Sequence, residues 1–172
     1  MAVVPPPAVR AWAGCAADAA ATLAPDLRWT RAEQRHITLQ FLGPVADPPP
    51  VAGFVADAVR RREPFTATLG GGGAFPDPRR ASVVWLGMRH GIDALIDLAV
   101  SLSSLSAEDR PYRPHLTLAR VNRARDMRAV IAALDACGAS PTWTVDEVVL
   151  FESDTRGDGA VHTEQARFRL VG

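Results

Sequence analysis

Two tetrapeptides of the same form, histidine, an aliphatic residue, threonine and leucine, begin at His36 and at His115. At this composition a given histidine is followed by x-Thr-Leu only about once in two hundred cases, so two such motifs among the 4 histidines are not a chance match. In a β-strand, residues two apart point to the same face. Each motif therefore predicts a strand that presents an imidazole beside a hydroxyl on one face.

Two such strands lying side by side would gather two imidazoles and two hydroxyls around one small volume. One imidazole can accept a proton from water while the other donates a proton to a leaving oxygen, and hydroxyls can donate to phosphoryl oxygens. We therefore predict that His36 and His115 are the acid and base for cleavage of a phosphodiester, with His36 favoured as the acid. Thr38 and Thr117 are predicted to hold the phosphate. This chemistry needs no metal and no other cofactor.

The elements that must position these residues follow from hydrophobic periodicity. Apolar residues recur with a helical period over 8–23, 51–59, 92–102 and 127–134, and with a strand period over 35–43, 65–69, 82–88, 115–121, 143–152 and 161–170. Turn-rich loops are expected over 70–76 and 155–159. The order of elements repeats approximately, once before and once after the middle of the chain. Hairpin-like connections then favour an α+β fold of two pseudo-symmetric lobes, each a mostly antiparallel sheet with helices outside.

Composition limits both the size of the fold and the chemistry. At 172 residues the chain fits one domain, 1–172, made of two small lobes that share a core. It is 48% apolar and 22% charged, as in ordinary soluble globular proteins. All 19 basic residues are arginines, so Schiff-base chemistry, Walker-type phosphate loops and lysyl-nucleotide ligases are excluded.

Charge, cysteines and hydropathy indicate the environment of the protein. The net charge is +0, so a phosphate-binding surface must be a local cluster of arginines. Cys15 and Cys137 lie far apart in alanine-rich stretches, which predicts buried, small apolar residues and a cytoplasmic location. The N-terminus lacks the features of a signal peptide, and no apolar run approaches about 18 residues. We expect a monomer that does not enter a membrane.

Beyond the two motifs, the sequence resembles the 2H phosphoesterase superfamily. Within it, the resemblance is to the bacterial and archaeal RNA 2′,3′-cyclic phosphodiesterases, historically labelled 2′-5′ RNA ligases. The matching segments follow the order of that family along most of the chain: 27–29, 36–43, 73–76, 79–80, 84–87, 110–120 and 149–153. The resemblance implies two pseudo-symmetric α+β halves with the histidines in a central cleft. It also implies that the chain opens the 2′,3′-cyclic phosphate of RNA ends or nucleotides to a 2′-phosphate, and that any ligation would be the reverse of this reaction.

Five residues beyond each histidine the two halves diverge, to Phe41 and to Arg120. The resemblance implies that the residues at these two positions contact a nucleobase or a phosphate. The structural alternatives are that Phe41 packs in the core and that Arg120 is an ordinary surface arginine. The final hairpin of the family usually carries an aromatic residue where this chain has His162. Since His162 lacks the following leucine and the strand context, we assign it to the surface. Arg79 and Arg80 could guide RNA phosphates or simply face solvent.

Three other functions remain open at this point. The same chemistry could act on a small cyclic nucleotide such as ADP-ribose 1″,2″-cyclic phosphate. A non-catalytic module that binds RNA ends could use the same cleft, although it would not need the two pairs of histidine and threonine. A two-histidine metal site is disfavoured because neither motif brings a carboxylate ligand, and such sites normally need three or more ligands.

Overall fold

The computed structural model describes residues 1–45, 47–105, 111–156 and 159–172. In this part of the chain the helices are α1 (Pro7–Ala21), α2 (Pro48–Val59), α3 (Ile92–Ser101) and α4 (Arg128–Ala136), with 3-10 turns η1 (Ala32–Gln34), η2 (Pro78–Arg80) and η3 (Ser103–Leu105). The strands are β1 (Ala2–Val3), β2 (Arg28–Trp29), β3 (Ile37–Thr38), β4 (Phe65–Phe75), β5 (Ala81–His90), β6 (Leu116–Arg125), β7 (Trp143–Val145), β8 (Glu147–Arg156) and β9 (Gly159–Arg169). The four expected helices are all present.

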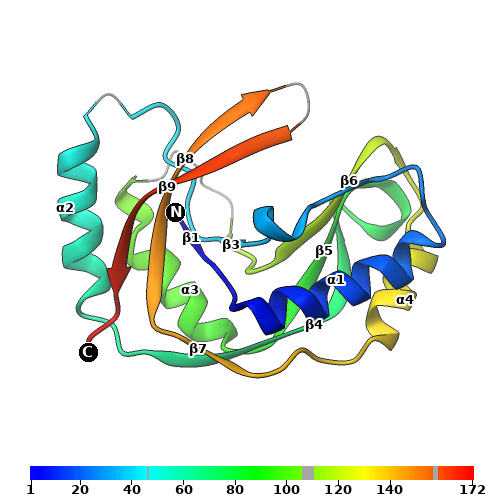
Figure 1. Cartoon of the computed structure of the whole chain (residues 1–172), viewed down its shortest axis with the longest axis horizontal. Coiled ribbons are helices and arrows are strands. Elements are labelled where there is room, and N and C mark those ends of the chain that lie inside the picture. Colours follow the sequence, from blue (N-terminus) through cyan, green and yellow to red (C-terminus); the bar gives the residue numbers. More distant parts are fainter. Residues whose placement is uncertain (46, 106–110, 157–158) are drawn as a thin grey trace.

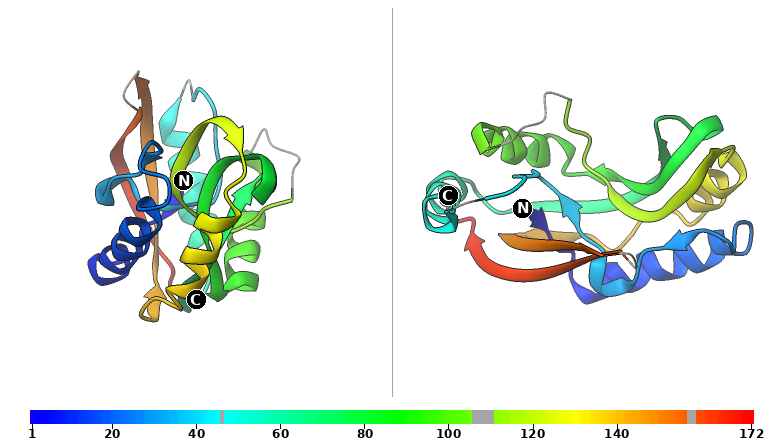
Figure 2. Two further views of the ribbon diagram at one scale, coloured as in Figure 1. Left: turned by 90° about the vertical axis from the view of Figure 1, so that its right-hand side faces the viewer. Right: turned by 90° about the horizontal axis from the view of Figure 1, so that it is seen from above.

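The strands form a sheet in the order β7-β4-β5-β6-β3-β1-β8-β9, with β2 paired to β6. Every described pairing is antiparallel. Helices α1 and α4 contact each other, and α4 contacts β4, whereas α2 contacts β9 and α3. The helices therefore lie outside the strands, one pair toward each end of the molecule (Figures 1 and 2). The expected α+β fold with antiparallel strands and outer helices is confirmed.

The two halves of the sheet are not the first and second halves of the chain, so that part of the expectation was wrong. One half is β7-β4-β5-β6, from the middle of the chain, and the other is β3-β1-β8-β9, from its two ends. The physical reason is the pairing of β1 with both β3 and β8. Because Ala2 is opposite both Thr38 and Val149, the C-terminal hairpin completes the sheet that the N-terminal residues begin.

Helix α1 shows how alanine builds the core of this protein. Its buried residues are Val9, Ala13, Ala16, Ala17 and Ala20, which recur along one side of the helix. Alanine has the highest helix propensity and lets neighbouring elements approach closely. Cys15, expected to be buried, is exposed on this helix, because the alanines occupy its core-facing side, and Cys137 is half-buried.

The glycine-rich segment expected to be a loop is the second part of strand β4, which extends to Phe75 with an irregular register between Leu69 and Gly72. Its glycines leave room for neighbours. A Cβ atom at Gly73 would lie 2.0 Å from the ring of Trp85, and one at Gly72 would lie 2.8 Å from the backbone oxygen of Ile131 in α4. Glycine is therefore required where a ring and a helix backbone approach the strand closely.

Other strands differ from their expected lengths. The first motif strand contains only Ile37 and Thr38, and the strand expected over 143–152 is split into β7 and β8. The turn between β8 and β9 includes residues 157–158, which lie outside the described residues. None of the helices in the described part of the chain is both long and apolar enough to span a bilayer.

The close packing at Gly73 gives a test of the fold. We expect Gly73→Ala to destabilise the protein by about 1–3 kcal/mol, because the added methyl group displaces the Trp85 ring from a packed position. Gly53→Ala is the matched control, since Gly53 lies within α2 and a Cβ atom there would have no described neighbour within 4 Å. There alanine should stabilise by about 0.5–1 kcal/mol. Thermal and urea unfolding of both variants measure the difference, and equal stabilities would contradict this account of β4.

Candidate active site

The two motif strands are neighbours at the middle of the sheet. Strand β3 pairs antiparallel with β6, and Ile37 lies opposite Leu116. Both of these side chains are fully buried. Continuing the register by one residue in each direction sets His36 opposite Thr117.

The same register sets Thr38 opposite His115. Residues directly opposite one another in an antiparallel pair have Cβ atoms about 4.5–5.5 Å apart. Since the aliphatic residues face the core, the histidines and threonines share the other face of the sheet, where all four are half-buried. The structure thus brings together the four residues that the sequence singled out.

Both histidine rings are anchored in the same way. Nδ1 of His36 lies 2.7 Å from the carbonyl oxygen of Gln34, and Nδ1 of His115 lies 2.7 Å from the carbonyl oxygen of Arg113. A carbonyl oxygen only accepts hydrogen bonds, so each Nδ1 carries a hydrogen and donates it. In the neutral form of each ring Nε2 is then a proton acceptor, and in the protonated form it is a donor.

Aromatic side chains pack around each histidine. The ring of His115 meets Phe75 edge to face with a centroid distance of 4.9 Å, and Trp85 at 5.9 Å. The guanidinium of Arg113 lies over these two rings, 5.9 Å from the Phe75 centroid and 6.0 Å from the Trp85 centroid. This half of the site is therefore built by β4, β5 and the segment that enters β6.

The ring of His36 has a different set of neighbours. Phe151 on β8 lies 5.9 Å from it, and His162 on β9 meets it edge to face at 4.8 Å. The assignment of His162 to the surface was therefore wrong. His162 is half-buried within a strand, and the β8–β9 hairpin, in which Ser153 pairs with His162, brings its ring against His36. The signal in the sequence was the aromatic position at which His162 stands.

The surroundings favour the neutral form of both central histidines. Burial, followed by the proximity of His162, lowers the pKa of His36 from its ordinary value to about 4. Burial, followed by the charge of Arg113, also lowers the pKa of His115. Both rings are therefore neutral at neutral pH, and an anion bound between them would raise both pKa values.

A break in strand β6 decides where Arg120 points. Strict alternation would put a residue five positions after His115 on the opposite face. However, the register of β5 and β6 shifts between the pairs Val84–Ala119 and Trp85–Thr117, and Leu118 and Ala119 are consecutive and both fully buried. This irregularity has the character of a β-bulge, and it returns the exposed Arg120 to the face of Thr117.

The same irregularity follows the first motif. The backbone N–H groups of Leu39 and Gln40 both donate to the carbonyl oxygen of Met1, at 2.9 and 3.3 Å. Two residues thus oppose one, as in a β-bulge, at the same distance from the histidine as in β6. Phe41 returns to the face of Thr38, and its side chain is 61% exposed. The core alternative for Phe41 is therefore wrong.

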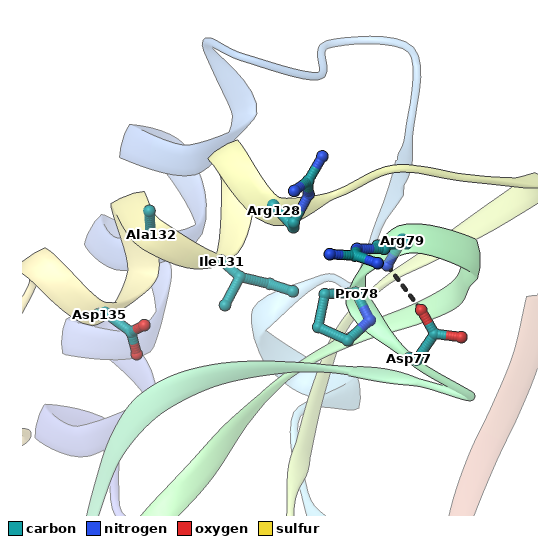
Figure 3. Close-up of a pocket in the computed structure, with 7 residues that line it drawn as sticks. All are labelled: Asp77, Pro78, Arg79, Arg128, Ile131, Ala132 and Asp135. Carbon is teal, nitrogen blue, oxygen red and sulfur yellow. Dashed lines mark hydrogen bonds between the residues drawn. The ribbon is translucent and has the colours of Figure 1, made fainter.

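A hollow of about 470 Å³ lies between η2 and α4 (Figure 3). Its lining residues are Asp77, Pro78, Arg79, Arg128, Ile131, Ala132 and Asp135. Arg79 lines it, whereas Arg80 does not. The carboxylate of Asp77 accepts the backbone N–H groups of Arg79 and Arg80, and Asp135 accepts that of Gly72. The hollow therefore mixes both signs of charge and lies apart from the histidines.

Within the described ranges, no group of three or more His, Cys, Asp or Glu side chains is placed to hold a metal ion.

Known proteins are similar to this chain in sequence and in fold. Residues 5–157 match the family model of the 2′-5′ RNA ligase superfamily. An RNA 2′,3′-cyclic phosphodiesterase of Methanothermobacter thermautotrophicus is 33% identical over 153 residues, which are 84% of this chain and 83% of that protein. A protein of the same name from Aquifex aeolicus is 28% identical over 163 residues, 84% of this chain and 82% of that protein.

Solved structures agree with these sequence matches. The protein TT0787 of Thermus thermophilus superposes with a TM-score of 0.75 at 25% identity, over 99% of this chain and 96% of that one. Escherichia coli LigT complexed with 3′-AMP superposes with a TM-score of 0.72 at 27% identity, over 99% and 96% of the two chains. With a family match along most of its length and the same fold throughout, this chain belongs to the 2′-5′ RNA ligase superfamily.

Proposed function

We propose that the chain is an RNA 2′,3′-cyclic phosphodiesterase that hydrolyses the cyclic phosphate of RNA ends or nucleotides to a 2′-phosphate. The observation that carries the proposal is the β3–β6 register, which sets His36 opposite Thr117 and Thr38 opposite His115. The relatives that bear this enzyme name support the substrate class. Every residue of the proposed site comes from one chain, which supports a monomer, and a cytoplasmic location is part of the same proposal.

In the proposed reaction, Nε2 of His115 accepts a proton from water as the water oxygen bonds to phosphorus. The bond from phosphorus to the 3′-oxygen breaks, and Nε2 of His36 donates a proton to that oxygen. The reaction leaves His115 protonated and His36 neutral, and exchange of one proton with solvent restores both. With a 5′-hydroxyl in place of water as the attacking group, the same steps would join RNA ends through a 2′-5′ bond, and the reverse of that reaction would cleave such a bond.

The surroundings of the two rings differ. At His115, burial and then the charge of Arg113 favour the neutral form that a base requires, while the hydrogen bond to the Arg113 carbonyl oxygen acts in the opposite direction. No arginine is among the groups that depress the pKa of His36 most, which are burial and the titratable ring of His162. The bound phosphodiester anion then supplies the charge that lets His36 hold a proton. Thr38 and Thr117 donate hydrogen bonds to the non-bridging oxygens of the phosphate.

The substrate assay separates this proposal from its rivals. The protein is incubated in excess chelator with 2′,3′-cyclic AMP, with an oligonucleotide that ends in a cyclic phosphate, and with ADP-ribose 1″,2″-cyclic phosphate. Chromatography identifies the products, and we expect 2′-AMP from the first substrate. A 3′-phosphate would overturn the assignment of the leaving oxygen, and tight binding without turnover would indicate a binding module.

Replacing either central histidine tests the mechanism. We expect His36→Ala and His115→Ala each to lower kcat by at least about 10²-fold, because each removes one proton-transfer group. The double variant should lose little more than either single variant, since the two groups act as a unit. His90→Ala is the control, because His90 is an exposed histidine at the end of β5. Near wild-type turnover in either single variant would refute the two-histidine mechanism.

Arg120 provides a separate test of substrate binding. We expect Arg120→Met to lower kcat/KM for the oligonucleotide by roughly tenfold, which is the effect of losing one hydrogen bond to a charged group. Most of the loss should be in KM. The matched control is Arg123→Met, which removes another exposed arginine from the same strand. If both variants behaved alike, Arg120 would have only a surface role.

A further inference from the structure

His162 makes a contact that the proposed reaction does not use. Its ring meets His36 edge to face, with a centroid distance of 4.8 Å and an interplanar angle of 84°. Phe151 lies 5.9 Å from both rings, so the three side chains form one cluster. Three of the 4 histidines of the chain therefore belong to the proposed site, and the rings of two of them are in direct contact.

The hydrogen bond of His162 allows the ring to change its charge without moving. Its Nδ1 lies 2.9 Å from the hydroxyl oxygen of Ser153. A hydroxyl can donate to Nδ1 when that nitrogen is unprotonated and can accept from it when it carries a hydrogen. The anchor therefore survives protonation of His162. In contrast, His36 is anchored by a carbonyl oxygen, which fixes the hydrogen on Nδ1.

The other half of the site has no titratable counterpart of His162 in contact with the histidine ring, as far as the described residues extend. His115 is packed against Phe75 and Trp85, which carry no proton that titrates near neutral pH. An apolar ring at position 162 would pack against His36 equally well. An imidazole at this position adds a second proton acceptor beside the first, and two adjacent imidazoles cannot both be protonated without strong repulsion.

We propose that His162 is a positioning residue that controls the protonation of His36, because the edge-to-face contact fixes the His36 ring and only one of the two rings can readily hold a proton. The proposal rests on the function proposed above, in which His36 exchanges a proton with the substrate. His162 is less deeply buried than His36, and it is the ring that takes up a proton from solvent first.

The other charged groups near His36 and His162 do not change the order in which the two rings take up a proton. The Met1 amino group, which donates to the carbonyl oxygen of Gln40, acts on both rings. His115, which directly precedes β6, acts on His36 as well. On β8, the carboxylate of Glu152 accepts a hydrogen bond from Gln165, and on β9 Glu164 is paired with Arg167. Burial lowers the pKa of His162 also, but the pKa of His36 falls further, to about 4.

The consequence is a coupled titration. As the pH falls, His162 takes up a proton and its charge keeps the neighbouring His36 neutral until the pH is much lower. Removing the imidazole while retaining a ring should therefore raise the pKa of His36. If His36 is the acid, the alkaline limb of the pH profile of kcat/KM moves up with it, and if His36 is the base, the acidic limb moves.

The test compares His162→Phe, which keeps a ring against His36, with His162→Ala, which removes it. The ring signals of His36 are followed by NMR from pH 4 to pH 9, with His90→Phe as the control for loss of an exposed histidine. We expect the pKa of His36 to rise by about one unit in both His162 variants and to stay unchanged in the control. The limb of the pH profile that depends on His36 should move by the same amount.

The outcome separates control of protonation from simple packing. If His162 only supported the His36 ring by packing, His36 in the His162→Phe variant would titrate as it does in the wild-type protein. That result would overturn the proposal. The NMR titration needs no turnover, so it stays decisive even if the chain hydrolyses no cyclic phosphate. Conversely, loss of the proposed function alone would show in the substrate assay and leave the titration shift intact.

Discussion

The pairing of β3 with β6 determines both the fold and the site. It joins the two halves of the sheet, and its register rests on Ile37 opposite Leu116. Full burial of such aliphatic side chains stabilises a protein by about 1.5–3 kcal/mol each. A slip of β3 by one residue against β6 would expose Ile37 and turn His36 and Thr38 toward the core. The hydrophobic effect that holds the sheet together is therefore also what aligns the proposed catalytic groups.

On this symmetric frame the two histidines receive different surroundings. Each ring donates Nδ1–H to the carbonyl oxygen two residues before it. Yet the residue that supplies the carbonyl is neutral Gln34 in one half and charged Arg113 in the other. An acid and a base that work together must hold opposite protonation states, and unequal surroundings favour one ring over the other as the holder of the proton. The pseudo-symmetry supplies the geometry, and the departures from it supply the difference in chemistry.

The sequence predicted the parts that depend on local periodicity. The motif at His36, the motif at His115 and the four helices follow from periods of two and of about 3.6 residues, and the structure has them in place. The β-bulges that re-aim Phe41 and Arg120 arise from single hydrogen bonds and register shifts between strands distant in sequence, which no local pattern encodes. For the same reason, no local pattern predicts that His162 lies beside His36, because this contact depends on the pairing of β8 with β1 and with β9.

The run of glycines in β4 shows how far the support of the site extends. The Trp85 ring fills the volume that a side chain at Gly73 would need, and Phe75, two residues further along, lies 5.3 Å from Trp85. Both rings contact His115. The glycines of β4 thus leave space for the aromatic rings of Phe75 and Trp85, which help to bury His115, and this burial lowers its pKa. In the other half, the rings that pack against His36 come from the C-terminal hairpin and are those of Phe151 and His162. Because His162 is polar, the packing that positions His36 also brings a second titratable group into contact with it.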